Sequence, residues 1–142
     1  MADGSKATLP TMKPSLTIGT TAEVVKLVTE DMCPAFEGVI VHRLYSTWSM
    51  AHHMELAARM VLAPHLHEDE EGIGSHLTID HIAPTPVGHT VRVVATATEV
   101  SASTVVCDVI TYDGDRVVGR GKQVQRVLPR TKLHALIQRA GQ

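Results

Sequence analysis

The chain has 142 residues, 44% of them hydrophobic and 20% charged, which predicts one globular domain and excludes global disorder. Its formal net charge of −2 argues against a nucleic-acid binder, which would present a basic face. No apolar run reaches the length of a membrane span, and the only cysteines, Cys33 and Cys107, form neither a disulfide framework nor a zinc pattern. Because the N-terminus also lacks an apolar signal core, we expect a cytoplasmic protein with neither nucleic acid nor membrane as partner.

The first third of the chain is weakly patterned. We expect residues 1–14 to form a flexible N-terminal tail, because they are small and polar and include two prolines, and residues 15–142 to form a single domain. The β-branched content of 15–29 favours an extended segment, and proline and glycine make 30–38 a loop. The pattern of 39–45 fits either a short strand or an approach to the next element.

The stretch "STWSMAHHMELAARMVL", residues 46–62, has helical periodicity. Ser46 or Thr47 can cap its start, and Pro64 ends or bends it. We expect the acidic, glycine-punctuated segment 65–74 to be a loop. The apolar face of the helix consists of Met50, Ala51, Met54, Ala57, Ala58, Val61 and Leu62.

From residue 75 the hydrophobic period changes to two, which predicts strands. Their short connections predict an antiparallel meander, and a helix followed by a run of strands favours the α+β class. The economical arrangement is a sheet of about five strands wrapped around one long helix, whose exposed edges favour pairing with a second copy. Gly119 and Gly121 indicate a bulge or a close approach in the last strand. The predicted strands are 75–83, 89–100, 104–112 and 116–128, with turns at 84–88 and 113–115 and a final helix at 131–140.

Glu55 lies at the edge of the apolar face of the predicted helix and admits three interpretations. Glu55 and Arg59 are spaced i, i+4 and could form a surface pair worth roughly 0.3–0.5 kcal/mol. His52 and Glu55 could share a metal ion, but the HExxH pattern is absent and this is the weakest interpretation. The third is a catalytic role; on spacing alone the surface pair is favoured.

His81 changes that balance towards catalysis. In the alternating segment "HLTIDHIA" it shares a face with Leu77 and Ile79, so if these two point at the helix, His81 does too. An inward histidine facing a helix that carries a carboxylate is a candidate base, and Glu55 would orient its ring.

The spacing Thr47-x7-Glu55, followed by "HIAPTPVG" from His81, resembles the hotdog-fold thioesterases, most closely the fluoroacetyl-CoA thioesterase subfamily. The resemblance covers roughly residues 39–128. It implies a hotdog fold, a homodimer, hydrolysis of an acyl-CoA thioester, and Thr47, Glu55 and His81 as the catalytic set. It also implies Gly74 as a backbone donor near the thioester, and no metal or redox cofactor is needed. The alternatives are a non-catalytic hotdog protein that binds acyl-CoA or another small ligand, and a hydratase acting on enoyl-CoA.

One geometric difficulty accompanies this set. Thr47 and Glu55 are eight residues apart, about 12 Å along a continuous helix, so both cannot touch one His81. Either Thr47 precedes the helix, or the site is assembled across a dimer interface, or Thr47 is only an N-cap.

Basic residues of the last predicted strand share one face, which is either a solvated outer face or a site for the phosphates of coenzyme A. The resemblance favours the second, with Arg120 and Lys122 as substrate-binding residues.

Overall fold

The structure is a computed structural model that describes residues 12–142. Residues 1–11 of the expected N-terminal tail therefore lie outside the described residues. At the start of the described part, Met12 is buried in the core, and the Lys13 amide donates a 2.8 Å hydrogen bond to the His65 carbonyl. No helix of residues 12–142 is long and apolar enough to cross a membrane.

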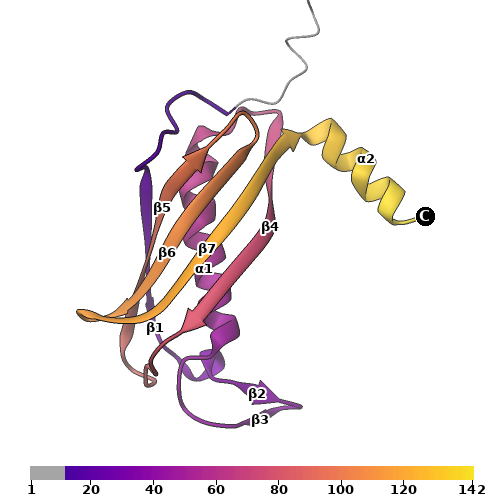
Figure 1. Ribbon diagram of the computed structural model, residues 1–142. Coiled ribbons are helices and arrows are strands. Elements are labelled where there is room, and N and C mark those ends of the chain that lie inside the picture. Colours follow the sequence, from indigo (N-terminus) through magenta and orange to yellow (C-terminus); the bar gives the residue numbers. More distant parts are fainter. Residues whose placement is uncertain (1–11) are drawn as a thin grey trace, which may run out of the picture.

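A five-stranded antiparallel sheet curves around one long helix, α1 (Thr47–Leu62), as Figure 1 shows. The expected α+β architecture, with about five strands and one long helix, is confirmed. The order across the sheet is β1-β5-β6-β7-β4. The bounds of these strands are β1 Thr21–Leu27, β4 Glu70–His81, β5 Thr90–Val100, β6 Thr104–Asp113 and β7 Arg116–Pro129.

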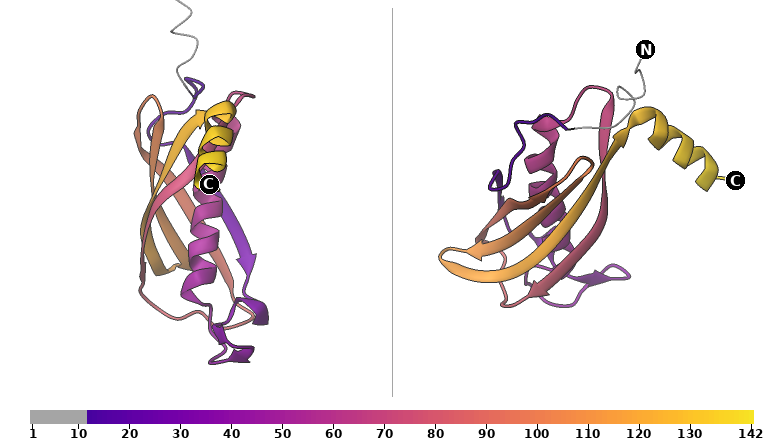
Figure 2. Two further views of the ribbon diagram at one scale, coloured as in Figure 1. Left: turned by 90° about the vertical axis from the view of Figure 1, so that its right-hand side faces the viewer. Right: turned by 45° about the horizontal axis from the view of Figure 1, so that its top comes forward.

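The remaining elements lie at the two ends of α1. A small hairpin of β2 (Ala35–Phe36) and β3 (Val39–Ile40) lies near its first turn. Two single 3-10 turns, η2 (Glu30–Met32) and η3 (Ala63–His65), precede and follow the helix region. The final helix α2 (Arg130–Ala140) projects away from the sheet, as the right-hand view in Figure 2 shows, and none of its residues is buried.

The predicted meander is only partly correct. Strands β5, β6 and β7 are successive antiparallel neighbours, as expected from their short turns. Strand β4, however, pairs with β7, and the other side of β5 is paired with β1. The segment 82–89 is therefore a crossover between opposite sides of the sheet. This leaves β4 as an edge strand with one side unpaired within residues 12–142.

The prediction of a loop over 65–74 is wrong from residue 70 onward, because β4 begins at Glu70. This charged start is possible because both carboxylates are satisfied. Glu70 is only 3% exposed, and its side chain accepts a 2.8 Å hydrogen bond from the His67 amide. Glu71 forms a 2.6 Å ion pair with Arg59 of α1. The ion pair with α1 thus allows a segment whose sequence is typical of a loop to form the start of a strand.

The two glycines of β7 allow the sheet to approach its neighbours closely. A Cβ atom on Gly119 would lie 2.4 Å from the sulfur of Met50, which is itself fully buried on α1. A Cβ atom on Gly121 would lie 2.1 Å from the backbone carbonyl oxygen of Thr78 on β4. The close approach expected of these positions is confirmed, and it places the central turns of α1 directly against the sheet.

Candidate functional site

The first turn of α1 meets the end of β4. Ser46 is the N-cap, and its hydroxyl accepts a 3.1 Å hydrogen bond from the Ser49 amide, so Thr47 is the first helical residue. His81 is the last residue of β4 and lies on the same face as Leu77 and Ile79, which pack against the core. The Thr47 hydroxyl and His81 Nδ1 are 2.8 Å apart. The inward orientation predicted for His81 is therefore confirmed.

Burial lowers the pKa of His81, an effect partly opposed by the backbone of Ala83. A neutral imidazole at neutral pH can accept the Thr47 hydroxyl proton at Nδ1, which places its own proton on Nε2. In this tautomer the Thr47 hydroxyl donates to Nδ1, and Nε2 is the donor nitrogen of the ring. The pair consists of a hydroxyl and an adjacent base, the arrangement that proton-transfer catalysis requires.

Glu55 lies elsewhere on α1 and has different partners. Its carboxylate accepts a 3.2 Å hydrogen bond from the side-chain amide of Gln123 on β7. It also lies over Gly74, where an added Cβ would be 2.9 Å from one carboxylate oxygen. The expected surface pair with Arg59 is wrong, because Arg59 bonds to Glu71 instead.

Within one chain the structure does not bring Glu55 and His81 together. Thr47 is helical, so about 12 Å of helix separates it from Glu55. Along β4, Gly74 and His81 are seven residues apart, about 23 Å of extended chain. Two of the three ways around the geometric difficulty are therefore wrong: Thr47 neither precedes the helix nor serves as its N-cap.

A cavity of about 550 Å³ opens above the Thr47–His81 pair. Its lining comes mainly from the segment 34–48, which contains the β2–β3 hairpin and the start of α1, and this size is typical of small-molecule sites. Trp48 from α1 and Phe36 from the hairpin form one wall, with ring centroids 5.5 Å apart at 85°. The hydroxyl of Thr47 and the ring of His81 are the polar groups of the lining that contact each other.

Comparison with known proteins now decides the family. The model of the fluoroacetyl-CoA-specific thioesterase family matches residues 28–131, a span that contains Thr47, Glu55, Gly74 and His81. The chain belongs to this family. The fluoroacetyl-CoA thioesterase of Streptantibioticus cattleyicolor is 30% identical over 94 residues, which are 66% of this chain and 68% of that protein.

Solved structures agree with the family assignment. A Thermus thermophilus hypothetical protein described as a thioesterase superfamily member has a TM-score of 0.84 and 37% identity, covering 89% of this chain and 93% of its own. A hot-dog-like protein from Thermanaerovibrio acidaminovorans has a TM-score of 0.80 at 20% identity, covering 98% and 97%. The fold is therefore the hotdog fold, and the chain is a member of a family of thioester hydrolases.

This family member also contains a buried polar pair that the sequence pattern did not reveal. Tyr45 and His53 are both buried, and the Tyr45 hydroxyl lies 2.5 Å from His53 Nδ1. Burial, with smaller contributions from His52 and Lys26, lowers the pKa of His53 from 6.5 to about 4, and burial raises the pKa of Tyr45. His53 is therefore a neutral acceptor for the Tyr45 hydroxyl. The sequence did contain one signal for the burial of His53, which is its position in the helix, one residue before Met54 of the buried face.

Gln123, the partner of Glu55, is a second residue that sequence reasoning missed. It is 1% exposed, and its side-chain oxygen has no hydrogen-bond partner among the described residues. The alternation of β7 contained the signal: Arg120, Lys122 and Arg126 are exposed, so Gln123 and Gln125 between them point towards α1. A glutamine in such a position requires a polar partner, and Glu55 supplies it.

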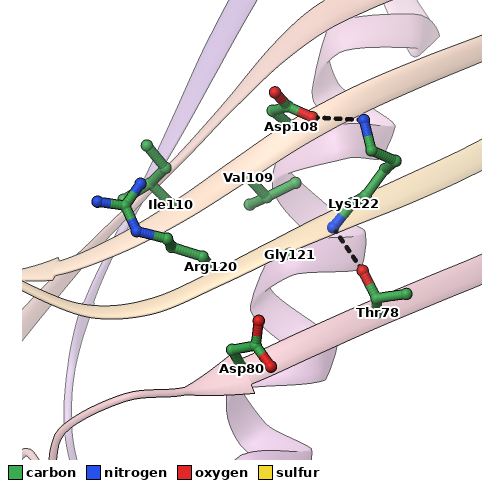
Figure 3. A pocket seen from close by; sticks show the side chains of 8 residues that line it. All are labelled: Thr78, Asp80, Asp108, Val109, Ile110, Arg120, Gly121 and Lys122. Atoms are coloured by element: carbon green, nitrogen blue, oxygen red, sulfur yellow. Dashed lines mark hydrogen bonds and ion pairs between the residues drawn. The ribbon is translucent and has the colours of Figure 1, made fainter.

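Arg120 and Lys122 lie on the outer face of the sheet, away from α1, as Figure 3 shows. Lys122 donates a 2.9 Å hydrogen bond from Nζ to Asp108 of β6, and its backbone amide donates to the Thr78 hydroxyl. The structure thus does not bring either residue to the Thr47–His81 pair. Binding of coenzyme A phosphates by Arg120 and Lys122 stays a prediction. Lys122 is the weaker candidate of the two, because its ammonium group is already paired with Asp108.

Proposed function

We propose that this protein hydrolyses acyl-CoA thioesters, with Thr47 and His81 of one subunit and Glu55 of a second copy forming each site. The observation that carries the proposal is the 2.8 Å contact between Thr47 and His81, which both line a cavity large enough for an acyl group. Membership of a thioesterase family supports the reaction class. No metal or redox cofactor is needed for this chemistry.

The proposed mechanism is direct hydrolysis. The thioester carbonyl carbon lies at the cavity floor, and a water aligned by the Glu55 carboxylate attacks it and gives its proton to that carboxylate. The C–S bond then breaks as the proton held by Glu55 is relayed through the His81 ring to the departing thiolate of coenzyme A, so that Glu55 ends as a carboxylate and His81 as a neutral imidazole. Thr47 supports the step because its hydroxyl contacts Nδ1 and so holds the His81 ring in position.

A homodimer would supply the missing carboxylate. The edge strand β4 has one side free within residues 12–142, and an unpaired edge is where a second copy can continue the sheet. In a two-fold antiparallel pairing, two residues face each other when they are equally distant from the axis. An axis through Thr78, together with the extra residue at the bulge between Gly74 and His76, would therefore place Gly74 of one copy opposite His81 of the other, and Glu55 lies over Gly74.

Gly74 has a specific place in this arrangement. A Cβ here would lie 2.9 Å from a carboxylate oxygen of Glu55, so another residue would make the Glu55 side chain shift, whereas glycine lets it lie directly on the strand. A backbone N–H near that point would stabilise the oxyanion that forms when the carbonyl is attacked. The role proposed for Gly74 is thus both a backbone donor and the space that Glu55 occupies.

The test is subunit complementation between two inactive variants. Glu55→Gln and His81→Ala are purified separately, and thiol release from acyl-CoA is measured for each and for a 1:1 mixture after subunit exchange. Each variant alone should be inactive. Because half of the mixed dimers are hybrids with one intact site of two, the mixture should regain about a quarter of the parent activity.

A matched control uses the double variant Glu55→Gln/His81→Ala. Mixed with Glu55→Gln, it should restore no activity, because neither copy then supplies the carboxylate of any site. Absence of any regain when Glu55→Gln and His81→Ala are mixed, in a sample shown to contain hybrid dimers, would contradict a site shared between subunits. Absence of thiol release by the parent from every acyl-CoA would contradict hydrolysis itself.

A further inference from the structure

The aromatic residues of this chain are concentrated at one place. The sequence contains only one Trp, two Tyr and one Phe. Three of these four, Phe36, Tyr45 and Trp48, line the cavity above Thr47. The fourth, Tyr112, lies on β6 beneath the guanidinium of Arg92. Tyr45 also belongs to the hydrophobic core, which is otherwise built from aliphatic and sulfur-containing side chains, whereas the exposed Phe36 and Trp48 do not and are therefore a feature of the cavity.

Two of the three rings are exposed to the cavity at considerable cost. Phe36 is 60% exposed and Trp48 47% exposed, although both are large apolar side chains. Their rings meet edge to face, with centroids 5.5 Å apart and planes at 85°. Two rings at a right angle form a corner, in which a third flat ring can stack on one face and present its edge to the other.

The remaining lining fits an uncharged ring. Pro34 and Pro84 contribute flat apolar surfaces, and no Asp, Glu, Lys or Arg is among the described residues that line the cavity. A cavity of roughly 150 Å³ suffices to bind benzene. The volume here is about 550 Å³, so an aryl group and the start of a pantetheine arm fit together. A two-carbon acyl group would leave most of this apolar surface uncovered.

We infer that the cavity binds an aromatic acyl group, such as an aryl or arylacetyl thioester, and that Phe36 and Trp48 determine this specificity. The inference rests on the proposed function, because the Thr47–His81 pair fixes where the thioester carbonyl lies. The aromatic ring then extends from the cavity floor into the corner between the hairpin and α1. Tyr45, whose hydroxyl is held by His53, forms the buried wall behind His81.

The kinetic test compares two acyl groups that differ in aromaticity but closely match in size, phenylacetyl-CoA and cyclohexylacetyl-CoA. Two favourable ring contacts should raise kcat/KM for the phenylacetyl ester about tenfold over the cyclohexyl ester. Trp48→Leu and Phe36→Leu should each reduce that ratio, while Tyr112→Leu, which removes an aromatic ring outside the cavity, should keep it. A ratio near one in the parent, or an unchanged ratio in both cavity variants, would overturn the inference.

A binding measurement keeps the acyl specificity separate from hydrolysis. Trp48 is the only tryptophan, so intrinsic fluorescence reports on this cavity alone. Titration with the non-hydrolysable thioether S-(2-phenylethyl)-CoA should change its emission at lower concentration than the cyclohexylethyl thioether does. Tighter phenylethyl binding without thiol release from any ester would support the aromatic cavity and refute the hydrolase proposal. Hydrolysis of the esters together with equal binding of the two thioethers would support the hydrolase proposal and refute the aromatic cavity.

Discussion

The buried Tyr45–His53 pair predicts a specific loss of stability in mild acid. His53 is 6% exposed and must stay neutral in the folded protein, where its pKa is lowered from 6.5 to about 4. In the unfolded chain the same ring takes up a proton below about pH 6.5. The unfolded state therefore binds more protons between these two values, and stability falls as the pH falls from 6.5 towards 4. Above pH 6.5 the contribution is fully present.

The magnitude follows from the two pKa values of His53. Between pH 7 and pH 5 the linkage relation gives a loss of about 2 kcal/mol, out of roughly 3 kcal/mol over the whole interval. The assay is urea unfolding at several pH values, comparing the parent with the double variant Tyr45→Phe/His53→Leu. Removing both partners avoids leaving a buried hydroxyl without a partner. The exposed His89, paired with Asp113, provides the control variant His89→Gln.

The parent and His89→Gln should both show the loss, whereas the double variant should lack about 2 kcal/mol of it. Parallel stability curves for the parent and the double variant would refute the reasoning, because they would mean that His53 does not titrate between the two states in this range. The m-value should stay constant in each series, since the surface exposed on unfolding does not change.

Three further outcomes are expected. Gly121→Ala should destabilise the fold by about 2 kcal/mol or more in urea unfolding, because its Cβ would lie 2.1 Å from the backbone oxygen of Thr78. Unchanged stability would show that β4 and β7 can move apart with little loss of free energy. Ser46→Ala should cost about 1 kcal/mol in the same assay through loss of the N-cap, while Ser46→Gly should cost only a few tenths. Gln123→Leu should lower kcat and leave KM nearly unchanged, because the Gln123 amide orients Glu55. A fall in kcat together with a similar rise in KM would indicate a general packing defect instead.

The secondary structure was readable from the sequence wherever one face of an element is buried. The helix predicted over 46–62 occupies Thr47–Leu62, because its apolar positions recur with the helical period and Ser46 caps it. The strands after residue 75 follow the period of two. The prediction failed at Glu70 and Glu71, since strand β7, which pairs with both residues, and Arg59, which pairs with Glu71, are distant in the sequence.

The sequence by itself determined the fold class, the inward orientation of His81 and the family, because periodicity and motif spacing are local properties that survive without knowledge of contacts. Only the tertiary structure decided which of these residues meet. It joined Thr47 to His81 and gave Glu55 to Gln123, because strand order and the straightness of a helix set distances that spacing along the chain does not encode. Burial likewise turned Tyr45 and His53 into a pair, since desolvation depends on what packs around a residue rather than on its neighbours in sequence.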